Sequence, residues 1–354
     1  NNMKYIIAID SFKGCLTSKE AAEAVYLNIV SHHPKAEIIT IPVSDGGDGM
    51  LNAFCKALGA TKETVNVRDA MMRRITAEYG ITNSGTAIIE VAQSCGLTLI
   101  EAELRNPLKA TSYGVGQLIA SAIKKGCRKF IIGLGGSATS DCGIGMLKAL
   151  IESFNDNGNF DDIRDIIKKC EFIIASDVTN PLCGPNGASH VFARQKGATE
   201  SMIDILEKRA IKFAEVSAMH IGHDCSNKPG AGAAGGLGYA FMQYMNAEMK
   251  SGADLLLDLI NFEDIARDAD LVITGEGASD KQTLMGKLPY VIMRRAKDIG
   301  IPTLLMAGKI DDKDELINAG FKDAICINPK SISIDEAMKK DVAISNIRDF
   351  PLSI

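Results

Sequence analysis

Short apolar runs alternate with amphipathic stretches along most of this chain of 354 residues, a pattern typical of strands followed by helices. Near the beginning, the apolar runs 5–9 and 38–43 each precede a helical stretch. The final third repeats the pattern, with apolar runs at 271–274, 303–307 and 324–327. Such alternation predicts a parallel sheet with helices packed on its faces.

The segment 64–99 differs, because three shorter strands are separated there by turn residues, as in an antiparallel arrangement. After residue 112 the strand–helix alternation returns. We therefore expect an α/β protein of two domains. Residues 1–62 plus 265–354 would form a flavodoxin/Rossmann-like domain whose parallel sheet is built from both chain ends. Residues 63–264 would form an inserted mixed-sheet α/β domain, with the active site in the cleft between the two.

The composition narrows the class of partner. The formal net charge is −5, so no basic surplus exists to neutralise nucleic-acid phosphates. Nine cysteines include no C-x-x-C pair, which indicates reduced thiols used mostly as core filler. No apolar run is long enough to span a bilayer, and no signal peptide is visible. We expect a cytoplasmic enzyme with small-molecule partners, in the form of a homodimer.

A loop rich in glycine and hydroxyl groups, 135–143, follows the apolar run 129–134 and precedes an expected helix from 146 to 154. Glycines let a backbone approach a phosphate closely, and the first N–H groups of a helix are free to bind an anion. Asp141 beside a phosphate would need a cation between the two groups. The loop therefore indicates phosphoryl transfer rather than binding alone.

Four further loops with acidic side chains follow expected strands, at 10–13, 45–48, 177–181 and 274–287. Ligands bind at the carboxyl ends of the strands in open α/β sheets. One such loop alone is most simply a helix cap. Five together provide carboxylates for Mg²⁺, amides and a lysine for phosphates, and a carboxylate for the attacking hydroxyl, which favours phosphoryl transfer.

Several features leave alternatives open. The glycine-rich run 230–238, before an expected helix at 237–249, fits either an anion cradle or tight packing. Arg105 could clamp a carboxylate or lie on the surface, and 194–196 is a similar polar cluster. The segment 133–138 matches a relaxed dinucleotide fingerprint, but the acid that ends the next expected strand, Asp177, lies about twice as far along the chain as the ribose-binding acid should. An NAD-dependent 2-hydroxy acid dehydrogenase and a non-catalytic metabolite-sensing protein are therefore the rival functions.

Seven ordered segments resemble the motifs of bacterial glycerate kinases of the glycerate/glyoxylate type. They are 10–14, 44–49, 135–139, 177–182, 195–198, 230–236 and 274–277. The resemblance implies ATP-dependent phosphorylation of D-glycerate, usually at the 2-hydroxyl, with Mg²⁺. The chain departs from the family pattern at Asn106, where an acid is usual, at Cys142, where a glycine is usual, and at Ala278, where a cation is usual.

The resemblance assigns roles as a hypothesis. Lys13 would stabilise the transferred phosphoryl group, and Asp177 would be the base, with Asp280 as its rival. Arg105, Ser11 and Asp10 would bind glycerate. The metal would be held by Asp45, Asp48 and Glu276. The nucleotide phosphates would be held by Gly135, Gly136, Ser137, Thr139 and Gly235.

Overall fold

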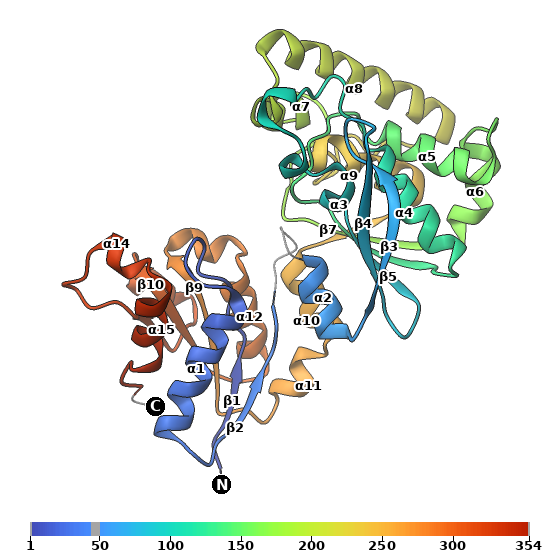
Figure 1. Cartoon of the computed structure of the whole chain (residues 1–354). Helices are drawn as coiled ribbons and strands as arrows, with labels where there is room; N and C mark the ends of the chain where they lie inside the picture. Colours follow the sequence, from blue (N-terminus) through green and yellow to red (C-terminus); the bar gives the residue numbers. More distant parts are fainter. Residues whose placement is uncertain (1, 44–49, 353–354) are drawn as a thin grey trace. The chain divides into compact units, whose positions relative to one another are not determined.

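The computed structural model describes residues 2–43 and 50–352 and divides into two compact units. Unit 1 comprises residues 1–45 with 253–354, and unit 2 comprises residues 46–252 (Figure 1). These limits differ from the expected domain limits, because helix α2 (Met50–Leu58) belongs to unit 2 and packs there on its sheet.

Unit 1 contains a five-stranded sheet in the order β11-β10-β9-β1-β2, in which every neighbouring pair is parallel. Read from the other edge this is the flavodoxin-like order 2-1-3-4-5, with the long insertion between the second and third strands. The expected parallel sheet built from both chain ends is therefore confirmed. The strands are β1 (Lys4–Ile7), β2 (Glu37–Thr40), β9 (Leu271–Ser279), β10 (Thr303–Ile310) and β11 (Asp323–Cys326). The helices are α1 (Ser18–His32), α10 (Gly252–Leu259), α11 (Phe262–Ala266), α12 (Leu288–Asp298), α13 (Lys313–Ala319), α14 (Ile334–Ala337) and α15 (Lys340–Arg348), with the 3₁₀ helix η4 (Lys281–Met285).

Helices cover both faces of this sheet. The neighbouring residues Leu305 and Met306 of β10 enter opposite core layers, because successive strand side chains alternate between faces. Helices α1 and α15 pack side by side on the Met306 face (Figure 1). The fully buried Asn28 of α1 donates to the carbonyls of Ile347 and Phe350, both at 2.8 Å, which ties the two ends of the chain together.

Unit 2 contains a six-stranded mixed sheet in the order β3-β4-β5-β6-β7-β8. The β3–β4 and β4–β5 pairs are antiparallel and the other pairs are parallel, so the expected mixed sheet is confirmed. The strands are β3 (Thr61–Arg68), β4 (Arg74–Ile81), β5 (Thr86–Glu90), β6 (Lys129–Gly133), β7 (Glu171–Ala175) and β8 (Glu248–Lys250). The helices are α2, α3 (Ala92–Cys95), α4 (Tyr113–Lys124), α5 (Ile144–Phe154), α6 (Phe160–Lys168), α7 (Ala188–Phe192), α8 (Glu200–Ile221) and α9 (Ala233–Met245), with the 3₁₀ helices η1 (Leu97–Leu99), η2 (Ala102–Leu104) and η3 (Arg194–Lys196).

The last strand of this sheet was not expected, since the sequence favours one helix from 237 to 249. Helix α9 instead ends at Met245, and Asn246 takes the left-handed conformation with φ +50°. Asparagine tolerates this region better than most residues, so it stops the helix and lets β8 join the edge of the sheet.

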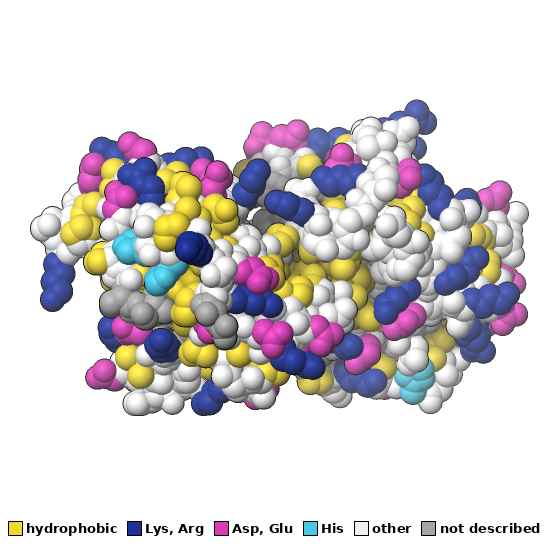
Figure 2. Space-filling view, turned by 90° about the horizontal axis from the view of Figure 1, so that it is seen from below, with side chains coloured by type: hydrophobic (Ala, Val, Ile, Leu, Met, Phe, Trp, Pro, Cys, Tyr) yellow, Lys and Arg dark blue, Asp and Glu magenta, His cyan; other side chains and the backbone are white. Residues whose placement is uncertain are grey.

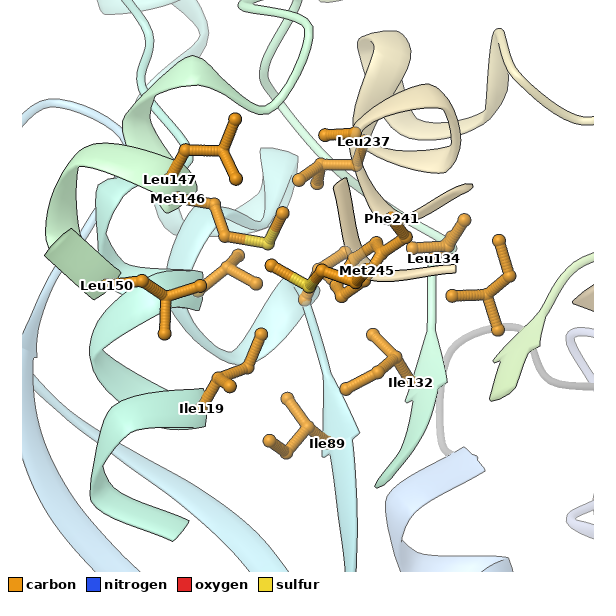
Figure 3. Packing of buried hydrophobic residues seen from close by; sticks show 14 of the residues in the cluster. Ile89, Ile119, Ile132, Leu134, Met146, Leu147, Leu150, Leu237, Phe241 and Met245 are labelled. Atoms are coloured by element: carbon orange, nitrogen blue, oxygen red, sulfur yellow. The ribbon is translucent and has the colours of Figure 1, made fainter. Parts of the chain in front are cut away.

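The core of unit 2 lies under helices α4, α5 and α9. Figure 3 shows Ile89 and Ile132, from the neighbouring strands β5 and β6, facing Ile119, Met146 and Phe241 of these helices. All five side chains have 0% exposure. Complete burial of such a side chain stabilises a fold by about 1.5–3 kcal/mol, so these strands give their carboxyl ends a rigid base.

Candidate functional site

The carboxyl ends of β1 and β9 meet where the strand order of unit 1 reverses, the point at which ligands bind in open α/β sheets. Asp10, Ser11 and Lys13 follow β1, and the amide of Asp10 donates to the carbonyl of Gly275 at 2.9 Å. A Cβ placed on Gly277 would lie 3.3 Å from the backbone nitrogen of Lys13. The loop after β1 therefore runs along residues 275–277, and the side chains of Ser11 and Lys13 are exposed there.

Glu276 lies in strand β9 and not in a loop, because β9 pairs with β10 as far as Ser279. The residue is 8% exposed, and its Oε1 accepts hydrogen bonds from Ser279 at 2.9 Å and from Thr283 at 2.6 Å. Its Oε2 lies 4.0 Å from Nζ of Lys287. Two hydroxyl groups therefore hold one oxygen of the Glu276 carboxylate, while the other oxygen faces the ammonium group of Lys287.

This carboxylate fits Mg²⁺, which usually binds one or two protein carboxylates together with phosphate oxygens and water. The described residues contain no group of three or more His, Cys, Asp or Glu side chains that could hold a metal ion. The other two expected metal ligands, Asp45 and Asp48, lie outside the described residues.

Asp280 caps the 3₁₀ helix η4. Its Oδ1 accepts from the amide of Gln282 at 2.7 Å, and its own amide donates to Oγ1 of Thr283 at 3.2 Å. This is the simple capping role that a single acidic loop suggests. A catalytic role for Asp280 stays a prediction.

In unit 2, Asp141 and the hydroxyl of Ser112, the residue before α4, lie at the start of helix α5. All four backbone N–H groups there donate to protein oxygens: Gly143 and Gly145 to the Asp141 carboxylate, each at 3.1 Å, Ile144 to the Asp141 carbonyl at 3.0 Å, and Met146 to the Ser112 hydroxyl at 3.0 Å. The expectation that these amides bind an anion is wrong, because Asp141 satisfies the helix start from within.

The accessible part of this loop lies earlier, at its two glycines. Gly135 and Gly136 are exposed, whereas Ser137 is only 6% exposed. The carbonyl of Gly136 accepts from the amide of Leu97 at 2.8 Å, which fixes the loop against the start of η1. A phosphate could therefore approach the loop at Gly135 and Gly136, and the buried Ser137 is the next residue along the chain.

The glycine-rich run packs tightly against the same loop. Gly235 has φ +63°, and a Cβ there would lie 1.8 Å from the carbonyl oxygen of Thr139. The carbonyl of Gly235 accepts from the amide of Cys142 at 3.0 Å. Of the two interpretations of residues 230–238, an anion cradle or tight packing, tight packing accounts for these contacts. Both Gly235 and Thr139 are buried, so nucleotide contact by either stays a prediction.

Cys142 has φ +54°, a backbone conformation that favours glycine. This explains why the glycerate kinase pattern usually has glycine at the position where this chain carries cysteine. Burial raises the pKa of the Cys142 thiol far above its ordinary value, so the thiol stays protonated. The residue is core filler, as expected for the cysteines.

Lys196 is a site residue that the sequence did not single out from its polar cluster. It is 4% exposed, and its Nζ donates to Oγ of Ser137 at 3.0 Å and to the carbonyl of Thr139 at 2.7 Å. Burial lowers the pKa of Lys196 to about 8. A Cβ on Gly197 would lie 2.7 Å from the carbonyl oxygen of Arg105, so the segment also contacts that loop.

Arg105 is partly buried, and its Nε donates to the carbonyl of Ile100 at 3.2 Å. Among the described residues its guanidinium forms no ion pair, which leaves it able to bind an anionic ligand. Asn106 accepts from the amide of Leu108 at 3.0 Å, a turn contact that an aspartate would also make. The departure at Asn106 therefore preserves the turn.

Asp177 is exposed two residues beyond the end of β7. The last residue of β7, Ala175, pairs with Gly133 at the end of β6. Parallel strands end at the same edge of a sheet, so Asp177 and the loop with Gly135 leave neighbouring strands at one edge. The structure thus brings these two predicted residues to the same side of the sheet in unit 2.

The model of the glycerate kinase family matches residues 5–349. The chain belongs to the glycerate kinase family. It is 37% identical to the glycerate kinase of Bacillus subtilis (strain 168) and 39% identical to the glycerate 2-kinase of Escherichia coli (strain K12). Each match covers 95% of this chain and 93% of the relative. A crystal structure of a protein provisionally named glycerate kinase 2, from Salmonella typhimurium LT2, matches with a TM-score of 0.81 and 33% identity, covering 98% of this chain and 96% of that one.

As a glycerate kinase family member the protein is a phosphotransferase with an alcohol group as acceptor. The dehydrogenase and metabolite-sensor alternatives therefore lose their support.

On the face in Figure 2, basic and acidic side chains are interspersed. None of the helices in the described residues combines the length and apolar character needed to cross a membrane.

Proposed function

We propose that the protein transfers the terminal phosphoryl group of ATP to the 2-hydroxyl of D-glycerate, giving 2-phosphoglycerate, with Mg²⁺. The observation that carries the proposal is the 39% identity to a relative named glycerate 2-kinase, over 95% of the chain. The strand-end loops support it, because they offer the carboxylates, amides and lysine that phosphoryl transfer uses. A cytoplasmic location and a homodimer stay predictions.

Arg105 would bind the carboxylate of glycerate. Its guanidinium carries several N–H donors in a plane that matches the two oxygens of a carboxylate. In unit 1, Asp10 and the exposed hydroxyl of Ser11 would accept from and donate to the hydroxyl groups of glycerate.

Lys13 would neutralise charge that develops on the transferred phosphoryl group, and its exposed side chain at the switch point of the sheet supports this role. Gly135, Gly136 and Ser137 would contact the nucleotide phosphates at the accessible part of their loop. Thr139 and Gly235 support that loop from behind, which is the role that their burial favours.

Asp177 would orient the attacking hydroxyl and accept its proton as the new bond to phosphorus forms. Its exposed position at the carboxyl edge of β7 supports the assignment. Asp280 is the weaker candidate, because its carboxylate caps η4.

Glu276, together with Asp45 and Asp48, would hold Mg²⁺. Mg²⁺ held there would supply positive charge that offsets part of the charge on the phosphates. The buried hydroxyl contacts of Ser279 and Thr283 would keep the Glu276 carboxylate in place for this purpose.

The test is a coupled assay of ADP release with D-glycerate, L-glycerate, tartronate and glycolate as acceptors. We expect the highest kcat/KM for D-glycerate and a strict requirement for added Mg²⁺. A higher kcat/KM for glycolate or tartronate would contradict the proposed substrate. ADP release in the absence of divalent metal would contradict the metal assignment.

A further inference from the structure

Lys196 carries an ammonium group inside the protein without a counter-ion in contact. It is 4% exposed, and among the described residues Lys196 forms no ion pair. Its two acceptors are neutral, namely the hydroxyl of Ser137 and the carbonyl of Thr139. A buried charge with neutral partners opposes folding, so stability alone does not account for this lysine.

The hydrogen bond to Ser137 has a fixed direction while Lys196 is charged. An ammonium group only donates, so Oγ of Ser137 must accept. The proton of that hydroxyl is then available for another acceptor. Among the described residues none accepts it. Ser137 directly follows the exposed Gly135 and Gly136, so an anionic ligand at these glycines would lie next to the available proton.

We propose that Lys196 is a positioning residue, which holds the Ser137 hydroxyl as a hydrogen-bond donor toward a phosphate oxygen of the bound nucleotide. This inference rests on the proposed function for the identity of the ligand. Lys196 itself stays behind the loop, and it acts through Ser137.

Two titratable groups face Lys196, the thiol of Cys95 and the carboxylate of Asp141. Burial raises the pKa of Cys95 to about 12, so this thiol stays neutral at physiological pH. The Asp141 carboxylate is engaged by the amides at the start of α5 and by Ser112. Loss of the proton of Lys196, whose pKa is about 8, would let the neutral amine accept from Ser137 and turn the hydroxyl away from the ligand. Nucleotide affinity should therefore fall as pH rises through this range.

The experiment measures the Kd for ATP by calorimetry, without glycerate, on the wild type, Lys196→Met, Ser137→Ala and the double variant. We expect each single variant to weaken binding by about tenfold, the effect of one charge-assisted hydrogen bond. The double variant should bind as weakly as either single variant and no more weakly. Lys125→Met, which removes an exposed lysine paired with Glu63, is the matched control and should bind ATP normally.

Two further measurements keep the test independent of folding. The wild-type Kd should rise between about pH 7 and about pH 9. This rise should be absent from Ser137→Ala, which has no hydroxyl, and from Lys196→Arg, because arginine stays charged. Additive effects in the double variant, or the same pH dependence in Ser137→Ala, would overturn the inference. Absence of glycerate phosphorylation by the wild type would instead overturn the proposed acceptor, while leaving the ATP comparison valid.

Discussion

The carboxylate of Asp141 accepts hydrogen bonds from both the backbone amide and the hydroxyl of Ser112, at 2.8 Å and 2.9 Å. Two more bonds, from the amides of Gly143 and Gly145, complete its shell. Asp141 thus joins the start of α4 to the start of α5, and its carboxylate holds the fold together next to residues 135–139.

Replacement of Asp141 by alanine should therefore destabilise the protein. Four amide and hydroxyl donors would lose a charged acceptor, and we expect a loss of about 2–5 kcal/mol in the free energy of unfolding. Urea unfolding measures this change, and Asp156→Ala, at an exposed acid of the same unit, should leave it within about 0.5 kcal/mol. A large loss of activity with unchanged stability would instead indicate a ligand role for Asp141.

Gly235→Ala should be severely destabilising. The new Cβ would lie 1.8 Å from the carbonyl oxygen of Thr139, and the residue has φ +63°. Because overpacking adds to backbone strain, the free energy of unfolding should fall by more than about 3 kcal/mol. Gly222→Ala is the matched control, because it has φ +91° and nothing within 4 Å of the new Cβ. It should cost only about 1–2 kcal/mol, the strain alone. Equal losses in the two variants would show that the contact with Thr139 contributes nothing.

Arg105→Ala should raise the KM for glycerate and leave the KM for ATP unchanged, because the guanidinium is assigned to the carboxylate of the acceptor. We expect an increase of about tenfold or more, the loss of a charge-assisted bidentate contact. Arg209→Ala is a suitable control, since Arg209 likewise donates to a single carbonyl, that of Leu108. Steady-state kinetics with each substrate varied in turn give the answer, and a parallel rise in both KM values would argue against the clamp.

Asp177→Asn should lower kcat by about 100-fold to 10,000-fold with little change in melting temperature, because it removes a base without removing a packed side chain. Asp280→Asn should leave both kcat and the melting temperature nearly unchanged, because an asparagine oxygen can cap η4 as the Asp280 carboxylate does. Near-normal turnover in Asp177→Asn, together with inactive Asp280→Asn of normal stability, would transfer the role of base to Asp280.

The sequence was sufficient to predict where the loops lie. Buried apolar runs such as the one at 271–274 indicate parallel strands, and parallel strands end at one edge. Two placements follow from this rule: Asp10 lies beside Gly275, and Asp177 and Gly135 follow the ends of neighbouring strands. The limits of β9 did not follow, because the pairing of Glu276 with β10 depends on a strand further along the chain.

The roles within the loops were harder to predict. Asp141 looks alike in sequence whether it caps a helix or binds a metal, and its main partner Ser112 lies 29 positions away. Lys196 contacts a hydroxyl 59 positions away, and its burial leaves no local signal in a polar cluster. Both assignments depend on tertiary contacts that local patterns do not carry.

The most direct test of the central claim is the ³¹P NMR spectrum of the product formed from D-glycerate, ATP and Mg²⁺. A phosphate on the secondary carbon couples to one neighbouring proton, whereas a phosphate on the primary carbon couples to two. Transfer to the 2-hydroxyl gives a doublet in the proton-coupled spectrum, which is the result we expect. A triplet, from 3-phosphoglycerate, or the absence of any phosphoglycerate signal would contradict the proposed function.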